Sequence, residues 1–261
     1  MAAPLIAYTS VAKTFDDGRV VAVDDVSLKV AEGEFLAIVG GSGSGKTTLL
    51  RLANRLIETD SGSITIEGED VRNVDPILLR RRIGYVFQSG ALFPHLTVAG
   101  NIGITPKLTG APPAEISARV DELLDLVRLD RAQYRTRLPH ELSGGQRQRV
   151  GVARALAAKP RIVLMDEPFG ALDPLTRDAL GEDFRELHRR LGLTTVMITH
   201  DVTEAILLAD RIAVMRGGKL LAQGTPSELS ESGDAYVGEL LRTPRRQAER
   251  LGALLPRDGA A

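Results

Sequence analysis

A short apolar run followed by a glycine-rich turn constrains the fold more than any other segment. Phe35–Val39 is wholly apolar, which is typical of a buried strand. The turn Gly40-Gly-Ser-Gly-Ser-Gly45 follows, and Lys46 and Thr47 begin a helical segment that reaches about Leu56. Glycines let the backbone curl so that its N–H groups point inward at an anion, and the helix N-terminus adds partial positive charge. This strand–turn–helix order predicts a phosphate-binding loop at the edge of a sheet.

Strands and helices alternate along the second half of the chain. Such alternation predicts a mainly parallel sheet with covering helices, an α/β fold. The predicted strands are 161–166, 194–199 and 211–215, and the predicted helices are 175–191 and 202–209.

Two regions depart from this pattern. Residues 5–30 alternate apolar and polar side chains, which predicts an N-terminal antiparallel subdomain with a turn at 16–18. Residues 97–159 are mostly helical, which predicts a helical subdomain inserted between two parts of the sheet. One apolar stripe lies at helical spacing in it, made of Ile116, Val120, Leu123, Leu124 and Val127. We expect one domain over 1–243 and a loosely ordered tail over 244–261.

The glycine-rich turn matches the pattern G-x-x-x-x-G-K-[ST]. Lys46 is expected to reach the β- and γ-phosphates of a nucleotide, and the Thr47 hydroxyl to bind Mg²⁺. The phosphate-binding set is predicted to comprise Gly40, Gly41, Ser42, Gly43, Ser44, Gly45, Lys46, Thr47 and Thr48.

Two carboxylates close the apolar strand that begins at Ile162. Asp166, at the carboxyl end, can hold Mg²⁺, usually through water. Glu167 is the next residue and points differently, so it can polarise the attacking water as a general base. These residues predict a nucleotide hydrolase, which is a broad class.

The segment Leu142-Ser143-Gly144-Gly145-Gln146 narrows that class. Here the chain resembles the ABC ATPase superfamily, whose signature is LSGGQ, and the resemblance covers about residues 5–230. The other motifs stand in the family order: Phe15 in the A-loop, Gln88 in the Q-loop, Ala171-Leu172-Asp173 in the D-loop, and His200 as the switch histidine. The resemblance implies a P-loop NTPase of the ABC ATPase type, with ATP and Mg²⁺ as its ligands.

The resemblance also implies roles for these residues. Phe15 would stack on adenine, Gln88 would contact the metal and the γ-phosphate, and His200 would contact the γ-phosphate. The catalytic set would be Lys46, Gln88, Glu167 and His200, and the metal set Thr47, Gln88 and Asp166. Taken singly, Phe15 is also compatible with a strand-edge aromatic, Gln88 with a surface residue and His200 with a structural histidine. His95, His140 and His188 share no metal-ligand spacing and are expected to be structural or exposed.

The signature makes physical sense by itself. Ser143 is a good N-cap, and Gly144 and Gly145 leave N–H groups open to an anion. In the family two subunits pack head to tail, so that one chain's Ser143, Gly144, Gly145 and Gln146 face the γ-phosphate held by the other chain's loop. We therefore expect a homodimer, with Asp173 also in the nucleotide site.

Composition favours a transporter subunit over a soluble ABC ATPase of DNA repair or translation. The net charge is −1 and cysteine is absent, so broad nucleic-acid binding and thiolate zinc modules are not expected. No apolar stretch approaches the roughly 20 residues of a spanning helix, and the N-terminus does not resemble a signal peptide. We expect a peripheral protein at the cytoplasmic face of the inner membrane, held by permease subunits and linked indirectly to a solute-binding protein.

Three segments resemble importers of glycine betaine, choline, carnitine and related osmoprotectants. They are residues 79–88, residues 91–98 with Asn101 and Ile102, and residues 199–206. Importers of polyamines, sulfate or nitrate, or a lipid-trafficking system, are alternatives. Any aromatic cage for a quaternary ammonium is expected in another subunit, since this chain has no Trp, four Tyr and six Phe.

The loop 91–101 is predicted to dock on the permease through Leu92, Phe93 and Leu96, although packing against the core is an alternative reading of these side chains. Some similar importers continue into paired CBS modules. Because about 30 residues follow Leu229, too few for such a module, we expect no osmotic sensor in this chain.

Overall fold

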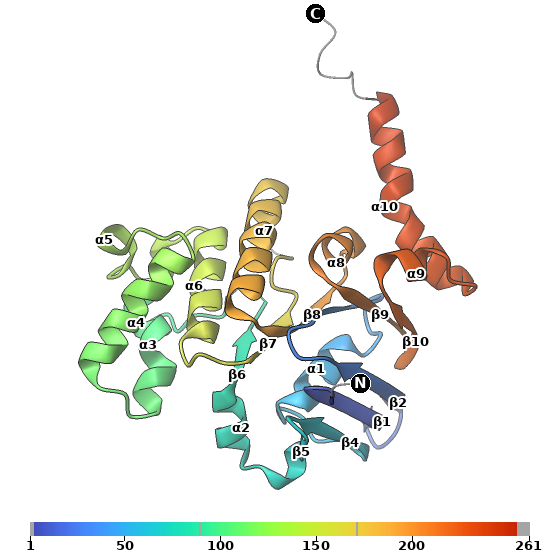
Figure 1. The fold of residues 1–261 in the computed structure, drawn as a ribbon, viewed down its shortest axis with the longest axis horizontal. Coiled ribbons are helices and arrows are strands. Elements are labelled where there is room, and N and C mark those ends of the chain that lie inside the picture. Colours follow the sequence, from blue (N-terminus) through green and yellow to red (C-terminus); the bar gives the residue numbers. More distant parts are fainter. Residues whose placement is uncertain (1–2, 89, 171, 255–261) are drawn as a thin grey trace, which may run out of the picture.

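A computed structural model of the chain describes residues 3–88, 90–170 and 172–254. Its centre is a sheet in which six strands of the described residues pair in the order β10-β9-β3-β8-β7-β6 (Figure 1). Strands β6 to β9 of this sheet run parallel, and β10 pairs antiparallel at one edge. The strands are β3 (Phe35–Val39), β6 (Ile83–Val86), β7 (Ile162–Asp166), β8 (Thr194–Thr199), β9 (Arg211–Arg216) and β10 (Lys219–Gly224).

The central sheet is buried on both faces because a hydrophobic core packs against each of them. Side chains alternate along each strand, so successive residues enter opposite cores. In β3, Phe35, Ala37 and Val39 join the core beneath the helices, whereas Leu36 and Ile38 join a second core beneath the antiparallel sheet. Every residue of β3 is 0% exposed. The uninterrupted apolar run therefore reflects a strand placed between two cores.

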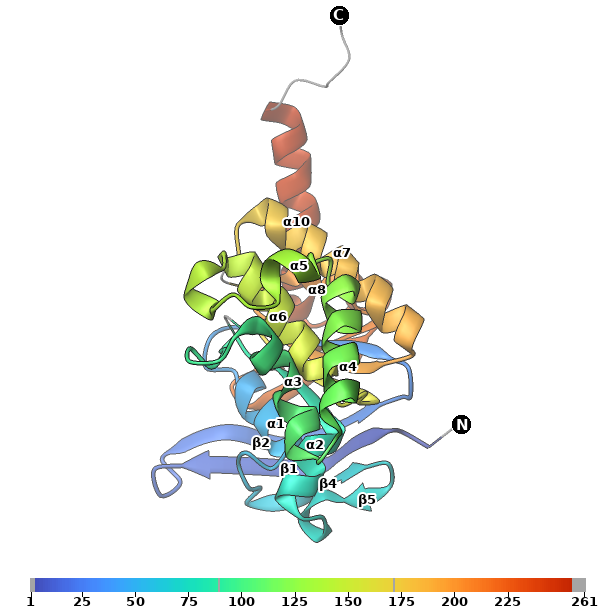
Figure 2. The ribbon, with the colours of Figure 1, turned by 90° about the vertical axis from the view of Figure 1, so that its left-hand side faces the viewer.

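A second sheet is antiparallel and has the order β2-β1-β4-β5. Figure 2 shows it at the lower end of the molecule, beneath α1 (Lys46–Ala53). Its strands are β1 (Ile6–Phe15), β2 (Val20–Val30), β4 (Ser61–Ile66) and β5 (Glu69–Asp70). A short helical turn η1 (Val71–Asn73) and α2 (Pro76–Arg82) lead back to the central sheet.

Helices gather beside the β6 edge of the central sheet and form the helical unit (Figure 1). Helices α3 and α6 pack on one another and enclose the stripe of Val120, Leu123 and Leu124. The unit comprises α3 (Val98–Leu108), α4 (Pro113–Leu126), α5 (Arg131–Tyr134), η2 (Pro139–Glu141) and α6 (Gly144–Leu156). The remaining helices are α7 (Pro174–Leu191), α8 (Val202–Leu208), α9 (Pro226–Ser230) and α10 (Ala235–Leu254).

These features confirm the predicted α/β class, with its mainly parallel sheet, antiparallel β subdomain and inserted helices. The expected loose tail is wrong for residues 244–254, which continue α10. Apart from Pro244 and Gly252, good helix formers fill this stretch, and Arg245 Nε donates to Glu249 Oε1 at 3.1 Å one turn on. The sequence reading also did not include β10. None of the helices within the described ranges is both long and apolar enough to cross a bilayer.

Candidate functional site

The glycine-rich loop joins β3 to α1 and is shaped by two close approaches. A Cβ on Gly40 would lie 2.1 Å from the Met215 carbonyl oxygen, and one on Gly45 would lie 2.0 Å from that of Ala22. Gly45 also has a φ of 98°, a left-handed conformation that glycine adopts without a steric penalty. The loop is therefore held between β9 and β2, and only glycine fits at either end.

The Lys46 ammonium lies inside this loop. It donates to the carbonyl oxygens of Gly40 at 2.8 Å and Gly41 at 3.0 Å, and to Ser44 Oγ at 3.4 Å. Lys46 is 6% exposed, and its burial lowers the pKa of the ammonium, with a partial offset from the carboxylates of Glu167 and Asp166. A buried cation ringed by neutral acceptors fits an anion well, because an anion stabilises the charged form.

Asp166 ends β7 next to the first turn of α1. Its Oδ1 accepts from Thr47 Oγ1 at 3.4 Å, and its Oδ2 accepts from Tyr85 Oη at 3.2 Å and lies 3.4 Å from Arg51 Nη2. Carboxylate and hydroxyl oxygens are the ligands that Mg²⁺ prefers, so Asp166 and Thr47 form a suitable donor pair. Tyr85 stays protonated as a donor, since burial and the charge of Asp166 raise the pKa of its hydroxyl.

Glu167 connects three separate segments of the chain. Its Oε2 accepts from Gln88 Nε2 at 3.1 Å and lies 3.2 Å from His200 Nδ1. The Glu167 backbone has a φ of 45° and donates its N–H to the Ile198 carbonyl oxygen at 3.0 Å. A positive φ is uncommon outside glycine, and here it turns the carboxylate away from the strand direction. The three predicted catalytic side chains Gln88, Glu167 and His200 thus meet at one point.

The signature segment caps α6. Ser143 Oγ accepts from Gln146 N at 3.3 Å, and Gln146 Oε1 accepts from Ser143 N at 2.9 Å, which forms a capping box. Gln146 Nε2 donates to Tyr134 Oη at 3.0 Å. The predicted N-cap at Ser143 is confirmed. Ser143 and Gly144 are exposed, so the helix N-terminus faces outward with its side-chain cap satisfied within the chain.

Two other predicted residues lie on exposed turns. Phe15 is 38% exposed at the end of β1, with Lys13 Nζ 5.5 Å from its ring centroid. Asp173 caps α7 by accepting from Thr176 N at 3.0 Å, and the hydrogen bonds from Thr176 lower the pKa of its carboxyl. Ala171, which opens the same motif, lies outside the described residues.

The other histidines agree with a structural or exposed reading. His188 is 2% exposed and its Nδ1 lies 3.0 Å from Thr195 Oγ1, while His95 and His140 are exposed. Within the described ranges, no three His, Cys, Asp or Glu side chains come together as a metal-binding group.

Sequence reasoning did not identify Tyr85 and Arg51 as partners of Asp166. Arg51 lies one turn after Thr47 on α1 and Tyr85 lies on β6, so each is a neighbour of β7 only in the folded sheet. Tyr85, a hydroxyl-bearing residue three positions before Gln88, was the available signal for such a partner.

Comparison with known proteins gave consistent matches. A family profile described as ABC transporter matches residues 23–170. The choline transport ATP-binding protein OpuBA of Bacillus subtilis is 49% identical over 242 residues, which cover 92% of this chain and 63% of that protein. The glycine betaine uptake system ATP-binding protein YehX of Escherichia coli is 50% identical over 222 residues, which cover 85% of this chain and 71% of that protein.

Solved structures agree with the sequence comparisons. An ATP-binding cassette in a dimeric post-hydrolysis state, bound to ADP and Pi, superposes with a TM-score of 0.76. It is 33% identical, and the match covers 84% of this chain and 98% of that one. The chain spans between 63% and 71% of the length of the two curated relatives named above.

Proposed function

Because the chain belongs to the ABC transporter family of ATP-binding subunits, we propose that it hydrolyses ATP in a head-to-tail dimer and couples the hydrolysis to solute uptake through a separate permease. The observation that carries this proposal is the meeting of Gln88, Glu167 and His200 at the same sheet edge as the Lys46 loop.

The loop and Lys46 bind the phosphates in this proposal. Backbone N–H groups of residues 41–48 line the anion, and the Lys46 ammonium exchanges the neutral carbonyls of Gly40 and Gly41 for phosphate oxygens. An ammonium–phosphate hydrogen bond carries charge on both partners and is stronger than the ammonium–carbonyl bond that it replaces, so this exchange favours the bound state. Phe15, exposed at the end of β1, offers a face on which adenine can stack.

Asp166, Thr47 and Gln88 are the residues that would hold Mg²⁺. When bound, this ion neutralises charge on the β- and γ-phosphates. Tyr85 and Arg51 hold the Asp166 carboxylate in place through its Oδ2, which leaves Oδ1 on the side of Thr47.

Glu167 takes the proton of the attacking water in this mechanism. A carboxylate that pivots freely is a poor base, because the water and its acceptor must be aligned. Gln88 and His200 both engage Oε2, and the backbone bond to Ile198 anchors the residue from behind. His200 is also placed to interact with the γ-phosphate from the β8 side.

A dimer completes the site in this proposal. The signature of one chain faces outward, with the Ser143 and Gly144 positions exposed, and can meet the γ-phosphate held by the partner's loop. The matched cassette is itself dimeric, which supports a dimer for this chain. Asp173, on the exposed start of α7, would lie at this interface.

Mixed dimers test the arrangement. A Lys46→Ala chain and a Gly144→Asp chain should each be inactive alone, whereas their heterodimer should regain part of the hydrolysis at its one intact composite site. Gly144 is a better position than Gly145, because a Cβ at Gly145 would lie 2.6 Å from Thr176 Cγ2 of the same chain. At Gly144 the nearest side-chain atom, Leu172 Cδ2, is 3.7 Å away.

The matched control for these mixtures is Gly144→Asn, which has nearly the same shape without the charge. It should retain more hydrolysis than Gly144→Asp, since only the carboxylate repels the partner's phosphate. Heterodimers isolated through two different tags that recover no hydrolysis would count against a site shared between chains.

We further propose that the predicted loop 91–101 docks on the permease through its first part, residues 91–97, which precede α3. Asn101 is fully buried and makes four hydrogen bonds of 2.8 to 3.1 Å to the backbone of residues 93, 96 and 97. Arg154 donates to the carbonyl oxygens of Gly90 and Ala91 at 2.9 Å each. The loop is therefore preorganised, with Phe93 44% exposed and Leu92 packed on the core.

Osmoprotectants of the quaternary-amine class are the proposed solutes, and we place this chain at the cytoplasmic face of the inner membrane, held there by the permease. The two relatives named for choline and glycine betaine support this class. Reconstitution with the permease that copurifies should give ATP-driven uptake of glycine betaine or choline. Uptake of a polyamine or an inorganic anion instead would change the solute class, and copurification with nucleic acid in place of a permease would contradict the transport role.

A further inference from the structure

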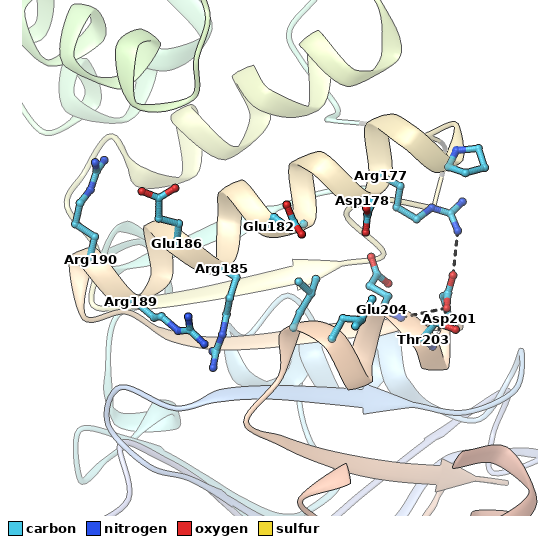
Figure 3. Close-up of a pocket in the computed structure, with 14 residues that line it drawn as sticks. Arg177, Asp178, Glu182, Arg185, Glu186, Arg189, Arg190, Asp201, Thr203 and Glu204 are labelled. Atoms are coloured by element: carbon cyan, nitrogen blue, oxygen red, sulfur yellow. Dashed lines mark hydrogen bonds and ion pairs between the residues drawn. The ribbon is translucent and has the colours of Figure 1, made fainter. Parts of the chain in front are cut away.

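A groove of about 870 Å³ lies between α7 and α8, next to the catalytic cluster. Figure 3 shows its charged walls, with Arg177 from the start of α7 reaching Asp201 at the start of α8. The segment just before α7 contains Asp173, and the residue just before Asp201 is His200. The groove therefore lies where the two site segments leave the sheet edge.

One guanidinium joins these two segments. Arg177 Nη2 donates to the Leu172 carbonyl oxygen at 3.2 Å, and Arg177 Nη1 lies 3.0 Å from Asp201 Oδ2. The Arg177 backbone N–H donates to the Asp173 carbonyl oxygen at 2.9 Å, which fixes the base of the side chain. A guanidinium presents its donors as a rigid planar fork, so these contacts hold the two segments at a set separation.

Asp201 transmits this constraint to His200. Its Oδ1 accepts from Thr203 N at 2.9 Å and Glu204 N at 3.2 Å, which caps α8. Its own N–H donates to Thr199 Oγ1 at 3.0 Å. His200 thus lies between two anchored residues, and its Nδ1 lies 3.2 Å from Glu167.

We infer that Arg177 is a positioning residue that couples the segment at Leu172 and Asp173 to His200. The inference rests on the proposed function, in which Asp173 lies at the dimer interface and His200 beside the γ-phosphate. Through Arg177, the conformation of the interface segment sets the position of His200 and hence of Glu167. The Arg177 and Asp201 side chains are 31% and 30% exposed. The ion pair between them therefore adds little to stability, and its loss leaves the chain folded.

Steady-state kinetics of matched variants test this inference. Arg177→Met should lower kcat roughly 10- to 100-fold through misplacement of His200, with the KM for ATP changed less than about 2-fold, because the phosphate loop is untouched. Asp201→Asn keeps a capping side chain but loses the ion pair, and should lower kcat in the same way. The double variant should lose no more than Arg177→Met alone, and Arg177→Lys should recover part of the rate.

Arg185→Met is the matched control. Arg185 lies farther along α7 and pairs with Asp210, which is at the other end of α8 from His200. It should keep the parent kcat. Equal kcat losses in Arg177→Met and Arg185→Met, independent losses that add in the double variant, or a raised KM with an unchanged kcat would each overturn the inference.

Hydrogen exchange measures the coupling without relying on turnover. In Arg177→Met, exchange should increase together at the amides of residues 172–176 and 200–205, and in Arg185→Met it should not. An increase confined to one segment, or none, overturns the coupling while leaving the proposed function intact. If the parent dimer binds ATP but does not hydrolyse it, the proposed function is refuted. In that case the hydrogen-exchange result still decides whether Arg177 couples the two segments.

Discussion

Replacement of Glu204 by glutamine should remove a pH-dependent loss of stability. Glu204 is 9% exposed in the first turn of α8, and its Oε1 has no hydrogen-bond partner among the described residues. Burial raises the pKa of its carboxyl from 4.5 to about 7, with a smaller contribution in the same direction from Asp201. The hydroxyl of Thr199 and the charges of Arg177 and His200 act in the opposite direction.

The raised pKa of Glu204 makes the protein less stable as pH rises. The folded chain holds the proton of Glu204 more tightly than the unfolded chain, so the stabilisation is complete below about pH 4.5. It is lost as pH rises and is gone above about pH 7. One pH unit corresponds to 1.36 kcal/mol, so the whole interval from 4.5 to about 7 corresponds to roughly 3 kcal/mol. Most of this, roughly 2 to 3 kcal/mol, falls between pH 5 and pH 8.

Urea unfolding at several pH values between about 5 and 8 measures the effect. Circular dichroism is the suitable signal, since the chain has no Trp. The free energy of unfolding of the parent, relative to Glu204→Gln, should fall by roughly 2 to 3 kcal/mol across this range. Differences between the two proteins cancel the titration of groups that do not interact with Glu204.

Glu182→Gln is the matched control, because Glu182 is an exposed carboxylate on the facing wall of the same groove (Figure 3). Its difference from the parent should be the same at every pH. A parent–Glu204→Gln difference that is constant with pH, or that grows in favour of the parent as pH rises, would refute the reasoning.

Three other changes have defined outcomes. Glu167→Gln should bind ATP normally and hydrolyse it roughly 10²- to 10⁴-fold more slowly, as phosphate release and nucleotide binding would measure; near-parent turnover removes its role as base. Phe93→Ala should abolish coupled uptake and keep basal hydrolysis, whereas equal loss of both with a lower melting temperature indicates a core residue. Gly45→Ala should lose ATP binding and melt earlier, because its Cβ would lie 2.0 Å from the Ala22 carbonyl oxygen. Gly41→Ala, with open space around the added Cβ, should melt like the parent and contradicts this reasoning if it melts as early as Gly45→Ala.

Local features of the site were readable from the sequence because their causes are local. The apolar run before Gly40 predicts a strand buried on both faces, and the glycines and Lys46 predict the loop and helix that follow. Ser143, with Gln146 three residues on, predicts the capping box that begins α6. Each prediction uses residues that are near neighbours in the chain, so their spacing carries the information.

The structure of the tail depends on an anchor that lies outside the tail itself. A loosely ordered tail is the prediction for 244–261, a segment rich in arginine, alanine and glycine, yet α10 continues to Leu254 with Pro244 inside it. Helix formation is cooperative, and the first two turns, anchored by buried Val237 and Leu241, favour extension through the good helix formers that follow Pro244. Composition alone does not contain that anchor.

Sequence spacing predicts the residues to which we assign the chemistry: the phosphate loop, the two carboxylates that end β7, and the signature that caps α6. Their partners are set by the folded arrangement of the chain. Tyr85 and Arg51 reach Asp166 from other elements, and Gln88 and His200 converge on Glu167 from strands on either side of β7. Arg177 likewise finds Asp201 across a groove. Such contacts depend on the order in which parallel strands pair, which long-range packing selects and no short spacing along the chain encodes.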